Sequence, residues 1–154
     1  MDLSNQNKFF TFLLENKLHG INKKDIDSFL PYENLFQLAK CPHFIKGFLV
    51  SKKQLVPVID LKIKLNLPET VLTRKTKILI VNCYINEVKV KVGALIDKHV
   101  EPDEIIKGTK NINIINISEL IDENDYLAIT NIVNNNLKKL KQKSLMLENI
   151  KLSN

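Results

Sequence analysis

Apolar residues along this 154-residue chain fall in short runs separated by polar turn residues. Phe9–Leu14 and Leu18–Ile21 lie on either side of the polar connection Glu15–Lys17, and this pattern predicts a β-hairpin. A later apolar run, Phe44–Val50, is followed by the polar break Ser51–Gln54 before apolar residues resume. The second pattern predicts another hairpin with an exposed tip, at the centre of the stretch around which the chain is organised.

From Leu55 to Leu65 apolar and polar residues alternate, which predicts a strand with one face in the core and the other in solvent. Pro57 lacks a backbone N–H for a strand ladder, so we expect it at an edge or a bulge.

Further strands are predicted after a polar connector at Asn66–Arg74. Lys77–Asn82 is a buried run and Val88–Val92 alternates, with Asn86 and Glu87 as the turn between them. Two shorter alternating runs follow on either side of the acidic segment Glu119–Asp125: they are Ile112–Ile117 and Tyr126–Val133. Many short strands with frequent turns are typical of an all-β barrel or sandwich.

Helical spacing is weaker and more local. Lys23–Leu30 predicts a turn of helix, with Asn22 as the candidate N-cap and Pro31 as its end. Glu33–Lys40 is ambiguous and is interpreted as a loop with at most one turn of helix. Near the C-terminus leucines and isoleucines recur at near-helical spacing between lysines, which predicts a C-terminal helix lying on the barrel; these residues are Leu137, Leu140, Leu147 and Ile150.

The length fits a single domain that can bury a core without metal or disulfide staples. We therefore expect one domain over residues 1–136, made of two subdomains with a connector near 66–75, and a C-terminal helix or tail over 137–154. The N-terminus lacks the basic and apolar segments of a signal peptide, and the two cysteines show no C-x-x-C spacing. These features predict a cytoplasmic protein without direct membrane insertion.

The net charge of +6 is divided along the chain. Residues 41–65 carry five lysines and one aspartate, net +4, whereas residues 111–136 carry four acidic residues and no basic ones, net −4. Of the 23 basic residues only Arg74 is arginine. Because bidentate recognition of bases and phosphates relies on arginine, sequence-specific DNA binding is disfavoured. A small basic β-barrel that binds nucleic acid through its lysines stays as the alternative function.

Two groups of side chains are candidates for chemical sites. Cys41 and His43 could form a thiol–imidazole pair or half of a metal site, but the remaining histidines and cysteine have no ligand spacing, so no metal is expected. Asp60 and Asp97 end two strong β runs without an accompanying nucleophile, and an aspartate in that place more often caps a turn. The sequence contains no nucleotide-binding or hydrolase motif. We therefore predict no catalytic residues, no cofactor and no enzyme activity.

The central stretch resembles the CheW family of chemotaxis coupling proteins. The family motif begins with a proline, two apolar residues and a glycine, continues through an Arg-Gly pair, and ends with a proline, two apolar residues, an aspartate and a leucine. In this chain the matching residues are Pro42, Phe44, Ile45, Gly47, Pro57, Val58, Ile59, Asp60 and Leu61. A second match runs from Val92 through Gly93 and Asp97 to Val100. Together with the first hairpin, the resemblance covers roughly residues 8–133.

The resemblance implies a mainly β fold of two five-stranded SH3-like barrels around a shared hydrophobic core. It also implies a non-enzymatic adaptor that couples the cytoplasmic tips of methyl-accepting chemoreceptors to a CheA-type histidine kinase. Receptor docking is expected on Ile26, Ser28, Gly47, Lys52 and Lys53, with kinase docking on the barrel of the N-terminal half. Pro42, Pro57, Asp60, Gly93 and Asp97 are expected to be structural.

The chain departs from the family at the hairpin tip. The family's arginine is Lys52 here, which keeps the charge without the planar guanidinium, and the glycine after it is Lys53. A lysine in that place costs on the order of 1 kcal/mol if the backbone needs a positive φ. A glutamate that the family often carries falls at Ser28, which removes a receptor-side charge.

Overall fold

The fold is given by a computed structural model that describes residues 8–101, 111–143 and 151–152. The elements in chain order are β1 (Phe9–Leu14), β2 (Lys17–Asn22), the 3-10 helix η1 (Lys23–Asp25), β3 (Ile26–Pro31), β4 (Ile45–Ser51), β5 (Gln54–Asp60), α2 (Leu61–Lys64), β6 (Lys77–Ile85), β7 (Val88–Ile96), β8 (Lys98–Val100), β9 (Asn113–Ile114), α3 (Ile117–Leu120), α4 (Glu123–Lys143) and β10 (Lys151–Leu152).

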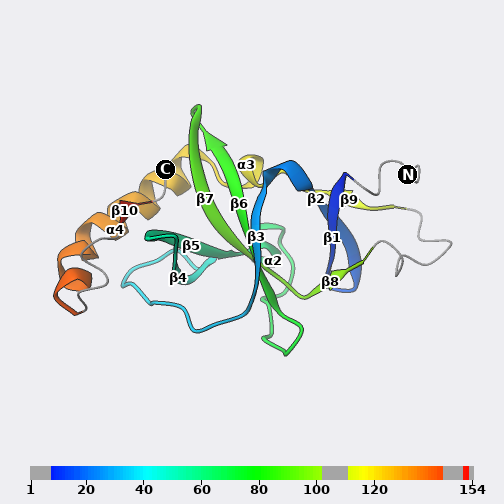
Figure 1. Cartoon of the computed structure of the whole chain (residues 1–154), viewed down its shortest axis with the longest axis horizontal. Coiled ribbons are helices and arrows are strands. Elements are labelled where there is room, and N and C mark those ends of the chain that lie inside the picture. The colour runs from blue at the N-terminus through cyan, green and yellow to red at the C-terminus, as the bar shows by residue number, and fades with distance from the viewer. Residues whose placement is uncertain (1–7, 102–110, 144–150, 153–154) are drawn as a thin grey trace.

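The strands form two sheets. One has the order β8-β1-β2-β9, and the other has the order β10-β5-β7-β6-β3 with β4 paired to β5. In Figure 1 the four-stranded sheet lies at the right, the long strands β6 and β7 stand at the centre, and α4 runs along the left. The expected mainly β fold with SH3-like curled sheets is confirmed, although the described strands divide as four and six rather than five and five.

Two hydrophobic clusters hold these sheets together. The larger cluster joins the two sheets and both C-terminal helices, with Phe12 from β1, Ile59 from β5 and Ile129 from α4 among its buried members. The smaller cluster lies on the other face of the six-stranded sheet and includes Val58 and Ile80. The central strands of this sheet are therefore covered on both faces, by the larger cluster on one face and by the smaller cluster on the other.

The expectation that the strand from Leu55 onward is half solvated is wrong. Six of the seven residues of β5 are buried, and Val56 and Val58 face the smaller cluster while Leu55 and Ile59 face the larger one. The strand also ends at Asp60, because α2 begins at the next residue. Of the polar residues in the alternating pattern, Asp60 is buried at the end of β5, and Lys62 and Lys64 lie on this short helix.

The helical turn expected at Lys23–Leu30 is also mostly a strand. Asn22 does cap a helix, since its side-chain oxygen accepts a hydrogen bond from the Lys24 N–H at 3.1 Å, but that 3-10 helix covers only three residues. The following residues form β3, which pairs antiparallel with β6. The strand forms because pairing with the buried β6 supplies backbone hydrogen bonds and cover for its apolar residues.

A strand was expected at Tyr126–Val133, where the structure has the helix α4. Ile129 and Val133, four residues apart, are both buried, which is the spacing of one helix face. Asp122 caps the helix: its side chain accepts from the Asp125 N–H at 2.8 Å, and the Asp125 side chain accepts from the Asp122 N–H at 3.2 Å. The acidic segment Glu119–Asp125, which the sequence suggested to be a loop between two strands, instead contains the end of α3 and the start of α4. Carboxylates in the first turn of a helix interact favourably with its dipole.

The C-terminal helix expected from Leu137 is present up to Lys143 but begins fourteen residues earlier, at Glu123. Leu147 and Ile150, which contributed to that expectation, lie outside the described residues. The strand expected at Ile112–Ile117 is reduced to β9, which pairs parallel with β2. Among the helices that the structure describes, none is long and apolar enough to cross a membrane.

Candidate docking surface

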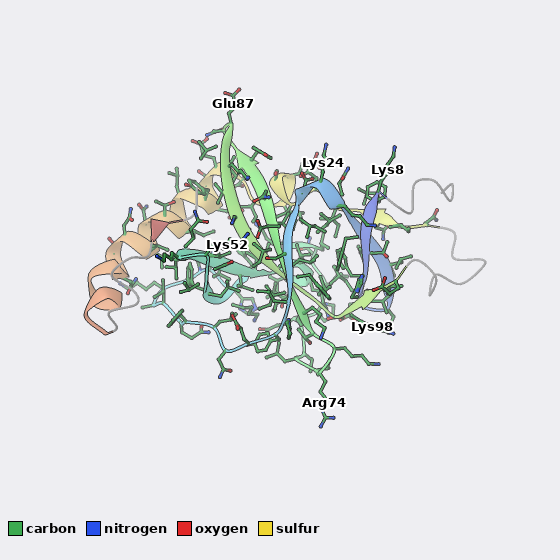
Figure 2. All side chains as sticks on the ribbon, viewed as in Figure 1. Lys8, Lys24, Lys52, Arg74, Glu87 and Lys98 are labelled. Atoms are coloured by element: carbon green, nitrogen blue, oxygen red, sulfur yellow. The ribbon has the colours of Figure 1, made fainter. Side chains whose placement is uncertain are left out.

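The hairpin between β4 and β5 presents two exposed lysines at its tip. Ser51 pairs with Gln54, so Lys52 and Lys53 are the two residues of the turn. Both have positive φ, 51° and 63°, as turns of type I′ require. Both residues are exposed, and the side chain of Lys52, labelled in Figure 2, is 68% exposed.

Replacing Lys53 with glycine should stabilise the protein by about 1 kcal/mol, because glycine adopts a positive φ without the clash of a Cβ atom. Urea denaturation measures this difference. Lys53→Ala is the matched control: it removes the charge, keeps the Cβ and should change stability by less than about 0.5 kcal/mol. Equal stabilisation by both variants would assign the effect to charge rather than to the backbone.

A bulge in β3 brings a carboxylate to this tip. Ile26 pairs with Val81 and Ser28 with Ile80, so Asp27 is the extra residue between them. The Asp27 Oδ1 lies 3.4 Å from the Lys52 Nζ and 3.5 Å from the Lys91 Nζ, and its Oδ2 accepts a hydrogen bond from the Ser28 Oγ at 3.2 Å. A bulge re-aims a side chain in this way. Asp27 therefore ties β3 to the β4–β5 tip and to β7.

These cations set the protonation of Asp27. Partial burial works to raise the pKa of its carboxyl group, but the ammonium groups of Lys91 and Lys52 and the hydrogen bond from Ser28 outweigh that effect and lower the pKa. Asp27 is therefore ionised at neutral pH. Asp27 thus places a carboxylate one residue before Ser28, the position at which the sequence comparison expected an acid to be missing.

The five residues expected to bind receptor differ in accessibility. Lys52 and Lys53 are exposed, Ile26 and Ser28 on β3 are partly buried, and Gly47 is buried. The structure brings Ser28 and Lys52 together through Asp27. Gly47 lies within β4, at the base of the hairpin rather than at its tip. We refer to Ile26, Asp27, Ser28, Lys52 and Lys53 as the tip surface.

Gly47 and Gly93 lie on either side of one residue. In the six-stranded sheet Val58 of β5 pairs with Gly47 on β4 and with Gly93 on β7. An added Cβ at Gly93 would lie 2.9 Å from the Val58 Cγ2, and one at Gly47 would lie 2.7 Å from the Leu35 Cβ. Both glycines therefore allow close packing around β5, which supports the base of the hairpin.

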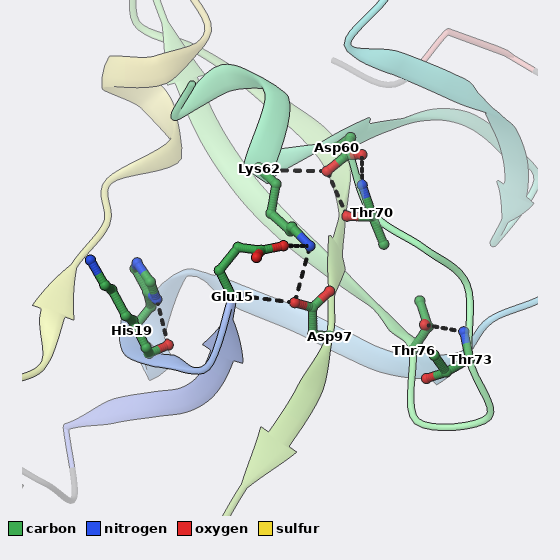
Figure 3. A network of polar contacts seen from close by, with 9 residues as sticks. Glu15, His19, Asp60, Lys62, Thr70, Thr73, Thr76 and Asp97 are labelled. Atoms are coloured by element: carbon green, nitrogen blue, oxygen red, sulfur yellow. Dashed lines mark hydrogen bonds and ion pairs between the residues drawn. The ribbon is translucent and has the colours of Figure 1, made fainter. Parts of the chain in front are cut away.

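Asp60 is a buried structural group (Figure 3). Its Oδ1 accepts hydrogen bonds from the Lys62 N–H at 3.1 Å and from the Thr70 hydroxyl at 2.7 Å. Its Oδ2 accepts from the Thr70 N–H at 2.8 Å. The carboxylate thus caps α2 and fixes the connector that follows it.

Asp97 belongs to a different network, also drawn in Figure 3. Its Oδ2 accepts from the Glu15 N–H at 3.0 Å and lies 3.3 Å from the Nζ of Lys62, which also pairs with the Glu15 carboxylate. Burial alone would lower the pKa of Lys62, but the two carboxylates raise it. This network joins the β1–β2 turn to α2 and the end of β7, so it links the two sheets.

The two motif prolines lie where no backbone N–H is needed for strand pairing: Pro42 in the turn before β4 and Pro57 within β5. The Pro42 carbonyl accepts from the Ile45 N–H at 3.0 Å in the turn before β4. Pro57 pairs with Phe48 of β4, while on its other side β5 pairs with β10 only at Gln54 and Leu55 and with β7 only from Val58. Pro57 therefore occupies a local edge, where no N–H is needed.

The thiols are poorly suited to nucleophilic chemistry. Burial raises the pKa of Cys41 above its ordinary value, against an opposing hydrogen bond to the Leu38 carbonyl, and burial raises that of Cys83 to about 12. Within the part of the chain that the structure describes, no three histidine, cysteine or acidic side chains are grouped to hold a metal ion.

The basic side chains labelled in Figure 2 are spread over the described part of the molecule. Lys8, Lys24, Lys98 and Arg74 lie at different parts of its outline, whereas Lys52 lies nearer the centre of the view. A nucleic-acid groove needs lysines or arginines along one continuous track. The geometry instead favours a small, local docking surface at the hairpin tip.

Comparison with known proteins identifies the family to which this fold belongs. The sequence profile described as the CheW-like domain matches residues 8–125, which is most of the chain. The chain belongs to the CheW-like domain family. Asp27 was not among the residues that the family motif pointed to, and only its position beside Ser28 hinted at it.

Two CheW proteins illustrate the relationship. The chemotaxis protein CheW of Klebsiella aerogenes is 33% identical over 57 residues, which are 37% of this chain and 34% of that protein. The crystal structure of the scaffolding protein TtCheW from Thermoanaerobacter tengcongensis superposes with a TM-score of 0.54 at 26% identity, covering 61% of this chain and 62% of that one. The matched part is therefore less than two thirds of either CheW protein.

Proposed function

We propose that this CheW-like protein is a non-enzymatic chemotaxis adaptor of the cytoplasm, which couples methyl-accepting chemoreceptors to a CheA-type histidine kinase. The observation that carries the proposal is the tip surface on a CheW-like fold: an exposed cationic turn joined to β3 through Asp27. Asp60 and Asp97 act in structural networks, so protein docking is the function that the geometry supports best.

Within this proposal the receptor docks on the tip surface and the kinase docks on the barrel of the N-terminal half. A receptor segment that meets the tip surface would bring a carboxylate to Lys52, whose ammonium group is exposed and only loosely held by Asp27 at 3.4 Å. Exposed ion pairs of this length contribute little, roughly 0 to 1 kcal/mol, so a partner carboxylate can replace Asp27 at small cost.

Reversing the charge at Lys52 should weaken binding of the receptor without weakening binding of the kinase. Lys52→Glu places a carboxylate beside Asp27 and opposite the receptor's acidic group, so receptor affinity should fall by about tenfold or more, while kinase affinity should change by less than about twofold. Pull-down and titration with a receptor cytoplasmic fragment and with the kinase measure the two affinities.

Arg74→Glu provides a matched control, since Arg74 is exposed, belongs to the connector between α2 and β6, and lies well away from Lys52 in Figure 2. It makes the same change in net charge and should leave both affinities near those of the unaltered protein. Equal loss of receptor and kinase binding in Lys52→Glu would reject the division of surfaces. If the unaltered protein binds neither partner, the adaptor proposal itself is wrong.

A further inference from the structure

A pocket of about 300 Å³ lies between β2, β9 and the segment that follows α2. Its lining includes Lys17 and His19 from β2, Leu65 and Leu67 from the segment after α2, and Asn113 and Ile115 from β9 and its end. A pocket of this volume can hold a small molecule. It shares no residue with the tip surface.

Backbone hydrogen bonds hold both walls of this pocket in place. On one wall β9 pairs parallel with β2, and the Ile115 N–H donates to the Gly20 carbonyl at 2.8 Å. On the other wall the Leu67 N–H donates to the Lys62 carbonyl at 2.7 Å. The pocket is therefore preformed, so a ligand does not have to order its walls on binding.

The pocket contains a buried histidine whose tautomer is fixed. His19 is 6% exposed, and its ring stacks on that of Phe12. The His19 Nδ1 lies 2.9 Å from the Lys17 carbonyl oxygen, which can only accept, so Nδ1 carries the proton of the neutral ring. Nε2 is then a hydrogen-bond acceptor. In Figure 3 this second ring nitrogen lies on the side of the ring away from the dashed hydrogen bond.

The surroundings of His19 favour this neutral ring. Burial lowers the pKa of the imidazole, and the nearby ammonium group of Lys17 lowers it further, against the hydrogen bond to the Lys17 carbonyl. His19 is therefore neutral at pH 7, and its Nε2 can accept a hydrogen bond from a ligand.

The other lining groups indicate the chemistry of that ligand. Leu65 and Leu67 pack against the larger hydrophobic cluster and Ile115 belongs to it, so one side of the pocket is apolar. Lys17 is exposed, and its ammonium group has no ion-pair partner among the described residues. A ligand that uses all of these features has an aliphatic body, a carboxylate for Lys17 and an N–H or O–H donor for Nε2.

We propose that this pocket binds a small aliphatic acid that carries a hydrogen-bond donor on the carbon next to its carboxylate, which is the chemistry of α-hydroxy and α-amino acids. The carboxylate pairs with Lys17, the donor bonds to the His19 Nε2, and the aliphatic chain packs on Leu65 and Leu67. This inference does not depend on the proposed chemotaxis partners.

A ligand series tests the proposal in the unaltered full chain at pH 7. L-2-hydroxy-4-methylpentanoate and L-leucine are titrated separately, and long-range proton–nitrogen NMR spectra follow the imidazole nitrogens. Each acid should shift the His19 Nε2 signal in a saturable way. The hydroxy acid should bind more tightly than L-leucine, because the Lys17 charge disfavours a second ammonium group nearby. 4-Methylpentanoate has the same body and carboxylate without the donor, and it should bind at least about tenfold more weakly than the hydroxy acid.

Three variants assign the contacts. His19→Phe keeps an aromatic ring beside Phe12 and removes Nε2, so affinity for the hydroxy acid should fall by about tenfold while affinity for 4-methylpentanoate changes by less than about twofold. Lys17→Gln removes the ammonium group and should weaken both acids by about fivefold. Lys75→Gln is the matched control: it removes the same charge from an exposed residue outside the pocket and should leave both affinities within about twofold.

Three results would each overturn the proposal: no saturable shift with either donor-bearing acid, equal affinity for the hydroxy acid and 4-methylpentanoate, or unchanged affinity for the hydroxy acid in His19→Phe. Circular dichroism checks that the variants are folded. If His19→Phe does not fold, the ligand series decides, because it removes the same hydrogen bond from the unaltered protein.

Discussion

Replacing Gly47 with alanine is expected to destabilise the protein by about 3 kcal/mol, one of the two largest effects of a single substitution that the structure predicts. The residue has a φ of 150°, which side-chain-bearing residues rarely adopt. An alanine Cβ would also lie 2.7 Å from the Leu35 Cβ and 2.8 Å from the Phe36 carbonyl oxygen. Phe36 exchanges two backbone hydrogen bonds with Phe48, so the segment over β4 cannot retreat without breaking them.

Thermal unfolding followed by circular dichroism measures this loss, which corresponds to a drop in Tm of about 6 to 12 °C. Gly93→Ala is the matched control on the other side of Val58. Its added Cβ meets the end of a side chain, the Val58 Cγ2 at 2.9 Å, rather than backbone. We expect Gly93→Ala to cost about half as much. A Gly47→Ala protein as stable as the unaltered one, with receptor binding lost, would instead assign Gly47 to the docking surface.

Replacing Asp60 with alanine should also cost about 3 kcal/mol. The change removes the buried acceptor of three hydrogen bonds, from the Lys62 N–H, the Thr70 N–H and the Thr70 hydroxyl. Without it α2 loses its cap and the connector loses its attachment to β5. Urea denaturation gives the change in the free energy of unfolding.

Thr70→Val is the control for this substitution, because it removes one of the three hydrogen bonds and keeps the carboxylate. We expect a loss of about 1 kcal/mol. If Asp60→Ala changed stability by less than Thr70→Val, the carboxylate would not be the centre of this network, and a role for Asp60 in binding would have to be considered.

The hairpins were predictable because their signals are local. Glu15 with Asn16, Lys52 with Lys53, and Asn86 with Glu87 are polar pairs between apolar runs, and all six residues have the positive φ of two-residue turns. The family motif likewise points to Asp60 and the two glycines, whose surroundings in the structure are buried and tightly packed.

The secondary-structure predictions were wrong where contacts distant in sequence, or a helix cap, decided between strand and helix. Apolar residues at Ile26, Phe29 and Leu30 suit a helical turn as well as a strand, and pairing with β6 selected the strand. The run from Tyr126 to Val133 contains both an alternation and an i, i+4 pair, and the reciprocal Asp122–Asp125 cap selected the helix.

The tip surface could likewise be predicted from the sequence only in part. Lys52 and Lys53 were predicted to lie at an exposed tip from the polar break alone, and they do. Asp27 joins them only because a bulge in β3 turns its carboxylate toward the lysines, and the sequence carries no signal for an extra residue in a strand. Likewise, both faces of β5 are buried because the sheet is curled between two cores, which the alternation in sequence did not indicate.

Reconstituted kinase activity tests the adaptor function most directly. A CheA-type kinase and a receptor cytoplasmic fragment are mixed with and without this protein, and transfer of the ATP γ-phosphate to the kinase is followed over time. We expect the receptor to change the rate of phosphorylation only when the unaltered protein is present, and the Lys52→Glu variant to abolish that dependence. A rate that is the same with and without the protein, at concentrations where the kinase and receptor are functional with another CheW protein, would contradict a coupling role.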